Sequence, residues 1–171
     1  MAQVALQYAV GSILSDCFED FRVVGSEIIL DVDASETPYT ADYTITAHDQ
    51  AIAFIVCDPA TAGTLTARLY HGTTHAAQLD TNAIYQGGSD GVNAPAATVV
   101  LDMTKAADRN AVIMVNPGAT DADGVGADKY LGKDKKVSLG FTSNASHSDG
   151  QSVIVVCVAG KLRNSPALSA V

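Results

Sequence analysis

The feature that most constrains the fold is a recurring two-residue alternation of apolar and polar side chains. Successive side chains of a β-strand point to opposite faces, so this period predicts strands with one face on a core and the other toward solvent. The apolar members of the five alternating segments are Ile28, Leu30 and Val32; Ala41, Tyr43, Ile45 and Ala47; Leu65, Ala67 and Leu69; Val99, Leu101 and Met103; and Val137, Leu139 and Phe141. Each segment is expected to be a half-buried strand of an antiparallel sheet.

Three further runs, 51–57, 111–115 and 153–159, are apolar almost throughout. They are short and rich in β-branched residues, which predicts fully covered central strands rather than helices. Clusters of Gly, Pro, Asn and Asp separate the strands, and the sequence shows no strand–helix–strand alternation. About eight strands of this kind predict an all-β fold, an antiparallel β-sandwich that is jelly-roll-like.

The first 24 residues carry two competing patterns. Seven apolar side chains share one helical face: Leu6, Val10, Ile13, Leu14, Cys17, Phe18 and Phe21. Val4, Leu6, Tyr8 and Val10 also alternate as in a strand. We expect a short helix around residues 10–18 after an extended arm, so that the chain divides into an N-terminal arm or helix, 1–24, and a β-sandwich domain, 25–171. A second short helical turn is expected at Thr104–Asp108.

Composition excludes several classes of protein. The 171 residues are 47% hydrophobic and 17% charged, which suits one folded domain and not a disordered chain. The net charge is −9, and the one lysine cluster, Lys129, Lys133, Lys135 and Lys136, is interrupted by Asp128 and Asp134. Binding to nucleic acid or to an anionic membrane surface is therefore not expected. The N-terminus lacks the pattern of a signal peptide, and no run approaches the length of a membrane span, so we expect a protein that is made and kept in a cytoplasm, or that assembles there into something released by lysis.

The sequence offers few candidates for chemistry. Asp121, Asp123 and Asp128 resemble part of a calcium loop, but a third acidic position and a closing Glu are missing, which favours a solvated loop over a metal site. His71 and His75 are separated by turn-forming residues, so a metal pair is disfavoured. Neither a nucleophile elbow nor a phosphate-binding loop occurs. We therefore predict no catalytic, cofactor-binding or metal-binding residues, no cofactor and no enzymatic activity.

Cysteine and tyrosine residues suggest packing roles. Cys17, Cys57 and Cys157 make an odd count without metal-ligand spacing, and Cys57 and Cys157 lie in apolar runs. A bridge between Cys57 and Cys157 is disfavoured. The chain has no Trp, and Tyr70 is the most suggestive residue for carbohydrate stacking, although a structural or interface role is favoured.

The Ala-, Thr-, Gly- and Val-rich runs 61–68 and 93–101, together with the acidic charge, give a resemblance. The chain resembles the small β-sandwich decoration, or cement, proteins of tailed-phage capsids. The resemblance implies a homo-oligomer, with a trimer favoured, on the outside of a virion, where it would bridge subunits of the major capsid protein. It also implies a reaching arm, with 2–21 and 161–171 as candidates. For 2–21, a helix packed on its own domain stays an equal alternative.

Two other functions stay open. The first is a soluble carbohydrate- or ligand-binding jelly-roll module, such as a phage fibre or receptor-binding component, which would show a cleft with clustered Tyr, Asn and Asp. The second is a cupin-type or hydrolytic enzyme, which would need converging His and carboxylate ligands.

Overall fold

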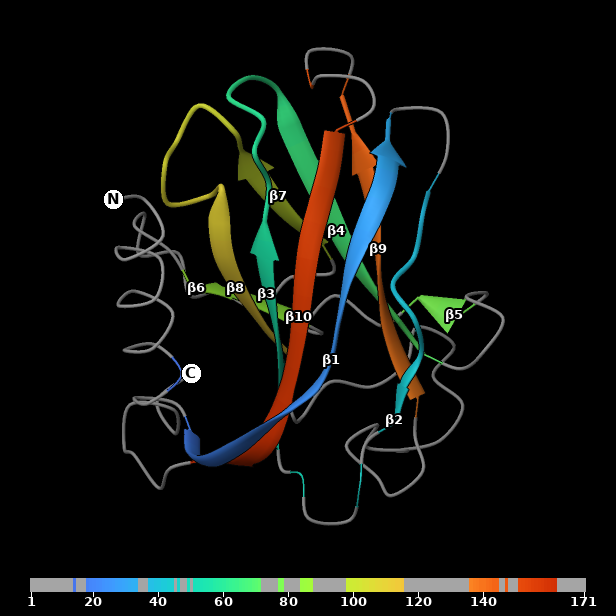
Figure 1. Cartoon of the computed structure of the whole chain (residues 1–171), viewed down its shortest axis with the longest axis vertical. Coiled ribbons are helices and arrows are strands. Elements are labelled where there is room, and N and C mark those ends of the chain that lie inside the picture. Colours follow the sequence, from blue (N-terminus) through green and yellow to red (C-terminus); the bar gives the residue numbers. More distant parts are fainter. Residues whose placement is uncertain are drawn as a thin grey trace.

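The computed structural model describes residues 14, 18–33, 37–44, 46, 49, 51–71, 77–78, 84–87, 98–115, 136–144, 147 and 151–162. These residues form ten β-strands and contain no helical element (Figure 1). The strands are β1 (Phe18–Val32), β2 (Tyr43–Thr44), β3 (Ala51–Cys57), β4 (Thr64–His71), β5 (Ala77–Gln78), β6 (Ile84–Gly87), β7 (Thr98–Asp102), β8 (Asn110–Val115), β9 (Lys136–Ser143) and β10 (Gln151–Leu162).

The strands form two sheets, and every pairing between them is antiparallel. Sheet A has the order β1-β10-β3-β8-β6, and sheet B has the order β2-β9-β4-β5, with β7 also paired to β4. Figure 1 shows β10, β3 and β8 in front of β4 and β9. The predicted all-β class and antiparallel pairing are confirmed.

One hydrophobic core receives side chains from both sheets. Sheet A contributes Ile52, Phe54 and Val56 from β3 and Val153, Val155 and Cys157 from β10; sheet B contributes Leu65, Ala67 and Leu69 from β4 and Val137, Leu139 and Phe141 from β9. Within each strand these residues are two apart, because alternate side chains of a strand share a face. Each fully buried side chain of this size contributes about 1.5–3 kcal/mol of transfer free energy.

All eight predicted strands are present, although their lengths differ from expectation. β2 is limited to two residues, whereas alternation predicted a strand over 41–47. β1 begins at Phe18, so the predicted boundary between arm and domain at residue 24 falls inside a strand. β5 and β6 were not predicted, because two to four residues are too few for a periodic pattern to emerge.

The orientation of β1 is a correction to the prediction. Ile28 and Leu30 were expected to face the core, but they are 60% and 62% exposed, and Ile29 is buried instead. Val32 is buried as predicted, because a shift in register between Ile29 and Val32 changes the face that follows. Three consecutive apolar residues, Ile28, Ile29 and Leu30, make the two faces of this strand indistinguishable by hydropathy alone.

The two predicted helical segments have different outcomes. Most of the helix expected around 10–18 lies outside the described residues; Leu14 is buried, and Phe18 already belongs to β1. The segment 103–109 consists of turns, and the backbone N–H of Arg109 donates to the carbonyl of Lys105 four residues earlier, so a single helical turn is present where one was expected. Asp102 accepts hydrogen bonds from the backbone N–H and the hydroxyl of Thr104, and this local competition for backbone donors favours a turn.

Candidate functional site

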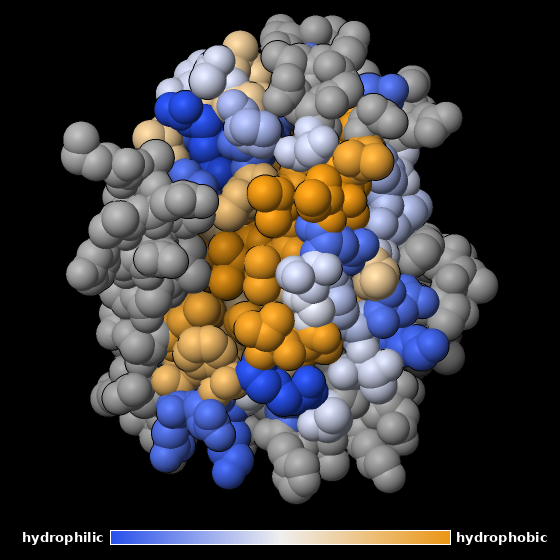
Figure 2. Space-filling model, in the orientation of Figure 1, coloured by the Kyte–Doolittle hydropathy of each residue, from blue (hydrophilic) through white to orange (hydrophobic). Residues whose placement is uncertain are grey.

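The outer face of sheet A, opposite the shared core, is almost entirely apolar. The register places its side chains in rows across β1, β10 and β3: Ile28, Ile154 and Cys57; Ser26, Val156 and Ile55; Val23, Val158 and Ala53; and Phe21, Gly160 and Ala51. Ser26 is the one polar side chain in these rows. Figure 2 shows the corresponding hydrophobic surface running along the middle of the molecule.

One half of this outer face is covered and the other is not. On β3 and β8, Ala53, Ile55 and Val112 are buried in a second cluster that also contains Leu14 and Phe18. On β1 and β10, five large side chains are exposed, and we call them the exposed strip: Phe21 (42%), Val23 (61%), Ile28 (60%), Leu30 (62%) and Ile154 (46%). Soluble monomers rarely expose contiguous apolar patches of this kind unless they serve an interaction.

Two charged side chains of β1, Glu27 and Arg22, are directed away from the exposed strip. Glu27 accepts hydrogen bonds from the hydroxyl of Tyr43 and from the backbone N–H of Ala41, at 2.8 Å for the latter. Burial and the Glu27 carboxylate together raise the pKa of Tyr43, which keeps its hydroxyl a donor. Arg22 forms an ion pair with Asp49 at 2.6 Å. These two charged groups therefore do not lie among the apolar side chains of the exposed strip.

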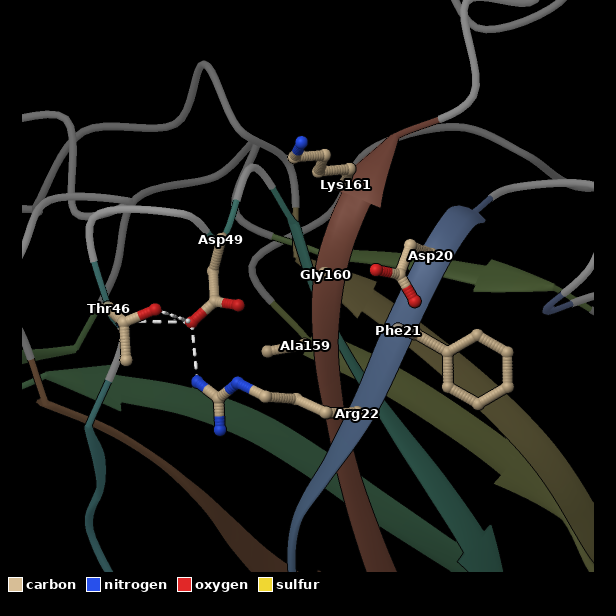
Figure 3. Close-up of a pocket in the computed structure, with 8 residues that line it drawn as sticks. All are labelled: Asp20, Phe21, Arg22, Thr46, Asp49, Ala159, Gly160 and Lys161. Carbon is tan, nitrogen blue, oxygen red and sulfur yellow. Dashed lines mark hydrogen bonds and ion pairs between the residues drawn. The ribbon is translucent and has the colours of Figure 1, made fainter.

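A hollow of about 220 Å³ lies beside the end of β1 and is lined by Asp20, Phe21, Arg22, Thr46, Asp49, Ala159, Gly160 and Lys161. Figure 3 shows Arg22 directed toward Asp49, with Phe21 on the opposite side of the strand. Asp49 also accepts hydrogen bonds from the backbone N–H of Thr46 (2.8 Å) and from its hydroxyl (2.9 Å). Arg22 is thus paired with Asp49 through one nitrogen of its guanidinium, while its side chain stays 46% exposed.

Burial by itself would raise the pKa of the Asp49 carboxyl. The Thr46 backbone N–H, the Arg22 guanidinium and the Thr46 hydroxyl together outweigh burial and hold that pKa below its ordinary value. Asp49 is therefore a charged anchor that ties β1 to the segment preceding β3. Its role follows from this network and is structural.

A buried His–Asp pair lies elsewhere in the molecule. His147 Nε2 lies 2.8 Å from Asp58 Oδ2, and both side chains are fully buried. Asp58 Oδ1 accepts a hydrogen bond from the backbone N–H of Ala60, and His147 Nδ1 has no hydrogen-bond partner. The pair links the turn after β3 to the connection between β9 and β10. Because neither side chain reaches solvent, the pair is not accessible to a substrate.

Most of the residues weighed for metal binding lie outside the described residues. These are Asp121, Asp123, Asp128 and His75, so the structure tests neither the acidic loop nor the histidine pair. Within the part of the chain that is described, no three His, Cys, Asp or Glu side chains are grouped as a metal site would need. No helix in that part has the length and apolarity to cross a membrane.

Tyr70 and the cysteines have packing roles. Tyr70 is 9% exposed, and its ring meets the ring of Tyr39 edge-on at 5.1 Å. Both rings cover Gly140, where a Cβ atom would lie 2.8 Å from Tyr70 and 2.9 Å from Tyr39. Cys57 and Cys157 are free thiols; Cys57 faces outward and Cys157 faces the shared core, so their strands pair without bringing the two sulfurs together.

Comparison of the chain with protein-family models, with curated proteins and with solved structures found no match.

Sequence reasoning missed the exposed strip and the Arg22–Asp49 anchor. The run Ile28-Ile29-Leu30 carried a signal for a strand that is apolar on both faces, but the ion pair joins residues 27 positions apart and leaves no local pattern.

Proposed function

We propose that this chain is a structural protein of a virion, a capsid decoration protein with a jelly-roll β-sandwich fold, and not an enzyme. It would form a homo-oligomer and bridge subunits of the major capsid protein on the outside of the shell. The single observation that carries the proposal is the exposed strip on the outer face of sheet A.

The nesting of strand pairs supports the jelly roll. Apart from the short β5 and β6, the described part of the chain forms eight strands, and their pairing is nested. The first pairs with the last, the second with the seventh, the third with the sixth and the fourth with the fifth, that is, β1 with β10, β2 with β9, β3 with β8 and β4 with β7. Such nesting results when one long antiparallel hairpin is rolled into two facing sheets. Jelly rolls of this kind are common in viral capsid proteins and also in lectins and cupins, so the fold alone does not select among these functions.

The exposed strip favours assembly over ligand binding. A small ligand requires a concave site with convergent polar groups, whereas the strip lies on strand faces and contains no charged side chain. A decoration protein needs a rigid body and an apolar contact surface, and the strip lies directly above the shared core. Water contact with Ile28, Leu30 and Val23 is unfavourable, so a partner that covers them gains about 25 cal/mol per Å² buried.

The alternative, a carbohydrate- or ligand-binding jelly-roll module, has less support. Tyr70, its best stacking candidate, is buried against Tyr39, and the hollow beside Asp49 contains an arginine already paired within the chain. No observation on the described residues favours this alternative over assembly.

The test is the protein composition of density-banded virus particles from the source of the sequence. The chain is expected to band with the capsid at a fixed ratio to the major capsid protein, and an antibody against it should label the outside of intact particles. Absence from banded particles, or labelling only after disruption, would overturn the proposal.

A further inference from the structure

We propose that two copies of this chain pack against each other through the exposed strip, outer face of sheet A on outer face of sheet A, about a two-fold axis. This inference deepens the proposed function and rests on it, because it names a second copy of the chain as the first partner of the apolar surface. It favours a dimeric unit over the trimer that the resemblance implies.

The distribution of exposed apolar side chains supports a two-fold arrangement. Of the six large apolar side chains that are exposed among the described residues, five belong to the strip, and the sixth, Val100, lies alone on β7 of sheet B. A trimer or ring joins two different patches on each subunit, whereas a two-fold dimer joins one patch to its own copy. One dominant patch therefore fits the two-fold case, in which aliphatic side chains meet aliphatic side chains on both sides.

The size and polarity of the strip are consistent with the interface of a two-fold dimer. Its five side chains, each 42–62% exposed, present roughly 400–500 Å². A standard interface buries about 800 Å² on each partner, and homodimer interfaces are about 65% apolar, which corresponds to about 500 Å² of apolar surface. The strip would thus supply the apolar centre, in which Ser26 lies between Val23 and Ile28, with the polar ends of β1 and β10 near the rim.

Charge does not oppose contact between identical copies at this surface. The chain carries a net charge of −9, so two copies repel each other unless the contact surface is neutral. The Glu27 carboxylate is directed to Tyr43 and Ala41, and the Arg22 guanidinium is directed to Asp49. Two facing strips would therefore leave the Glu27 and Arg22 charges outside the contact, and strands of the two copies could stack at the usual sheet separation of about 10 Å.

The experiment measures the mass of the full chain in solution by light scattering after size exclusion, from low micromolar to near-millimolar concentration. The wild type is expected to reach twice the 17.6 kDa of one chain. Ile28→Glu puts a charge within the strip. Loss of an interface hot spot typically lowers affinity about 30-fold, and in a two-fold dimer the change is present in both copies. The dissociation constant of the dimer should therefore rise about 1000-fold. Val100→Glu is the matched control, since Val100 is 55% exposed on the other sheet, and it should leave the mass unchanged.

A second readout covers the case in which Ile28→Glu does not fold. Cys57 faces the same outer surface next to Ile154, and Cys157 is buried in the core. In a Cys17→Ser background, the rate at which a thiol reagent modifies Cys57 should fall as protein concentration rises, because the dimer covers this face.

Three outcomes overturn the inference: a monomer at every concentration, a wild-type trimer, or a dimer that Ile28→Glu leaves intact. These failures are distinguishable from failure of the proposed function, since a monomeric chain that still bands with virus particles would retain the virion role and lose only the two-fold contact.

Discussion

Replacing His147 with alanine is expected to lower the free energy of unfolding by about 3–5 kcal/mol. The substitution removes the one hydrogen bond to Asp58 Oδ2 and leaves that carboxylate oxygen in a fully buried site. Breaking a buried pair by deleting one partner costs about this much, because the remaining group keeps its desolvation penalty without compensation. For a chain of this length, each kcal/mol shifts the melting temperature by about 2–4 °C, so a fall of roughly 6–20 °C is expected.

The assay is equilibrium unfolding in urea, monitored by circular dichroism. Asp58→Asn is the matched control: it preserves the shape and the acceptor for the Ala60 N–H, and its amide can still hydrogen-bond the ring. It should cost less than His147→Ala, and in its background the loss from His147→Ala should shrink by at least about 1.5 kcal/mol. A loss below about 1 kcal/mol for His147→Ala, or strictly additive losses, would refute the reasoning that the pair stabilises the link between the turn after β3 and the β9–β10 connection.

Two other predictions test the sheet and its anchor. Gly160→Ala should destabilise the fold by about 3 kcal/mol or more in urea unfolding, because its Cβ would meet the backbone of Asp20 and Phe21, and neither can move without opening the β1–β10 pairing. The control, Ser26→Ala on the open outer face, should change the free energy of unfolding by less than about 0.5 kcal/mol. An equally small effect of Gly160→Ala would contradict the close approach of the two strands. The folded-state pKa of Asp49 is depressed, so its contribution to stability is present above the ordinary value near 4 and is lost as pH falls through the folded value. Asp49→Asn should therefore be less stable than wild type at neutral pH, with the difference narrowing below about pH 4; a constant difference down to about pH 2 would show that the carboxylate charge contributes nothing.

The strands were predictable because their causes are local. In β4, Leu65, Ala67 and Leu69 are all buried, and in β9, Val137, Leu139 and Phe141 are all buried, as two-residue alternation required. In β3, the run Ala51–Val56 is buried on both faces, because sheet A lies between the shared core and the second cluster around Leu14. In these strands, the hydropathy of each residue is therefore enough to predict whether its side chain is buried.

The candidate site was not predictable, because it depends on which covering layers are present. Ile154 belongs to an apolar run that was expected to be fully covered, yet it is 46% exposed. Val158, four residues along the same strand, is buried by the cluster that contains Leu14 and Phe18. The two side chains are chemically alike, and only their neighbours in space distinguish them.

By itself, the sequence determined that this chain forms β-strands, roughly where they lie, and that its composition suits a folded protein. Only the tertiary structure decided which face of β1 is buried. Ile28, Ile29 and Leu30 are equally apolar, and a shift in register between Ile29 and Val32 changes which alternate residues face the core. The tertiary structure also decided that Arg22 meets Asp49 and that His147 meets Asp58, contacts made across 27 and 89 positions of sequence. Alternation is a property of one strand, whereas an exposed face and a long-range pair are properties of how strands are stacked.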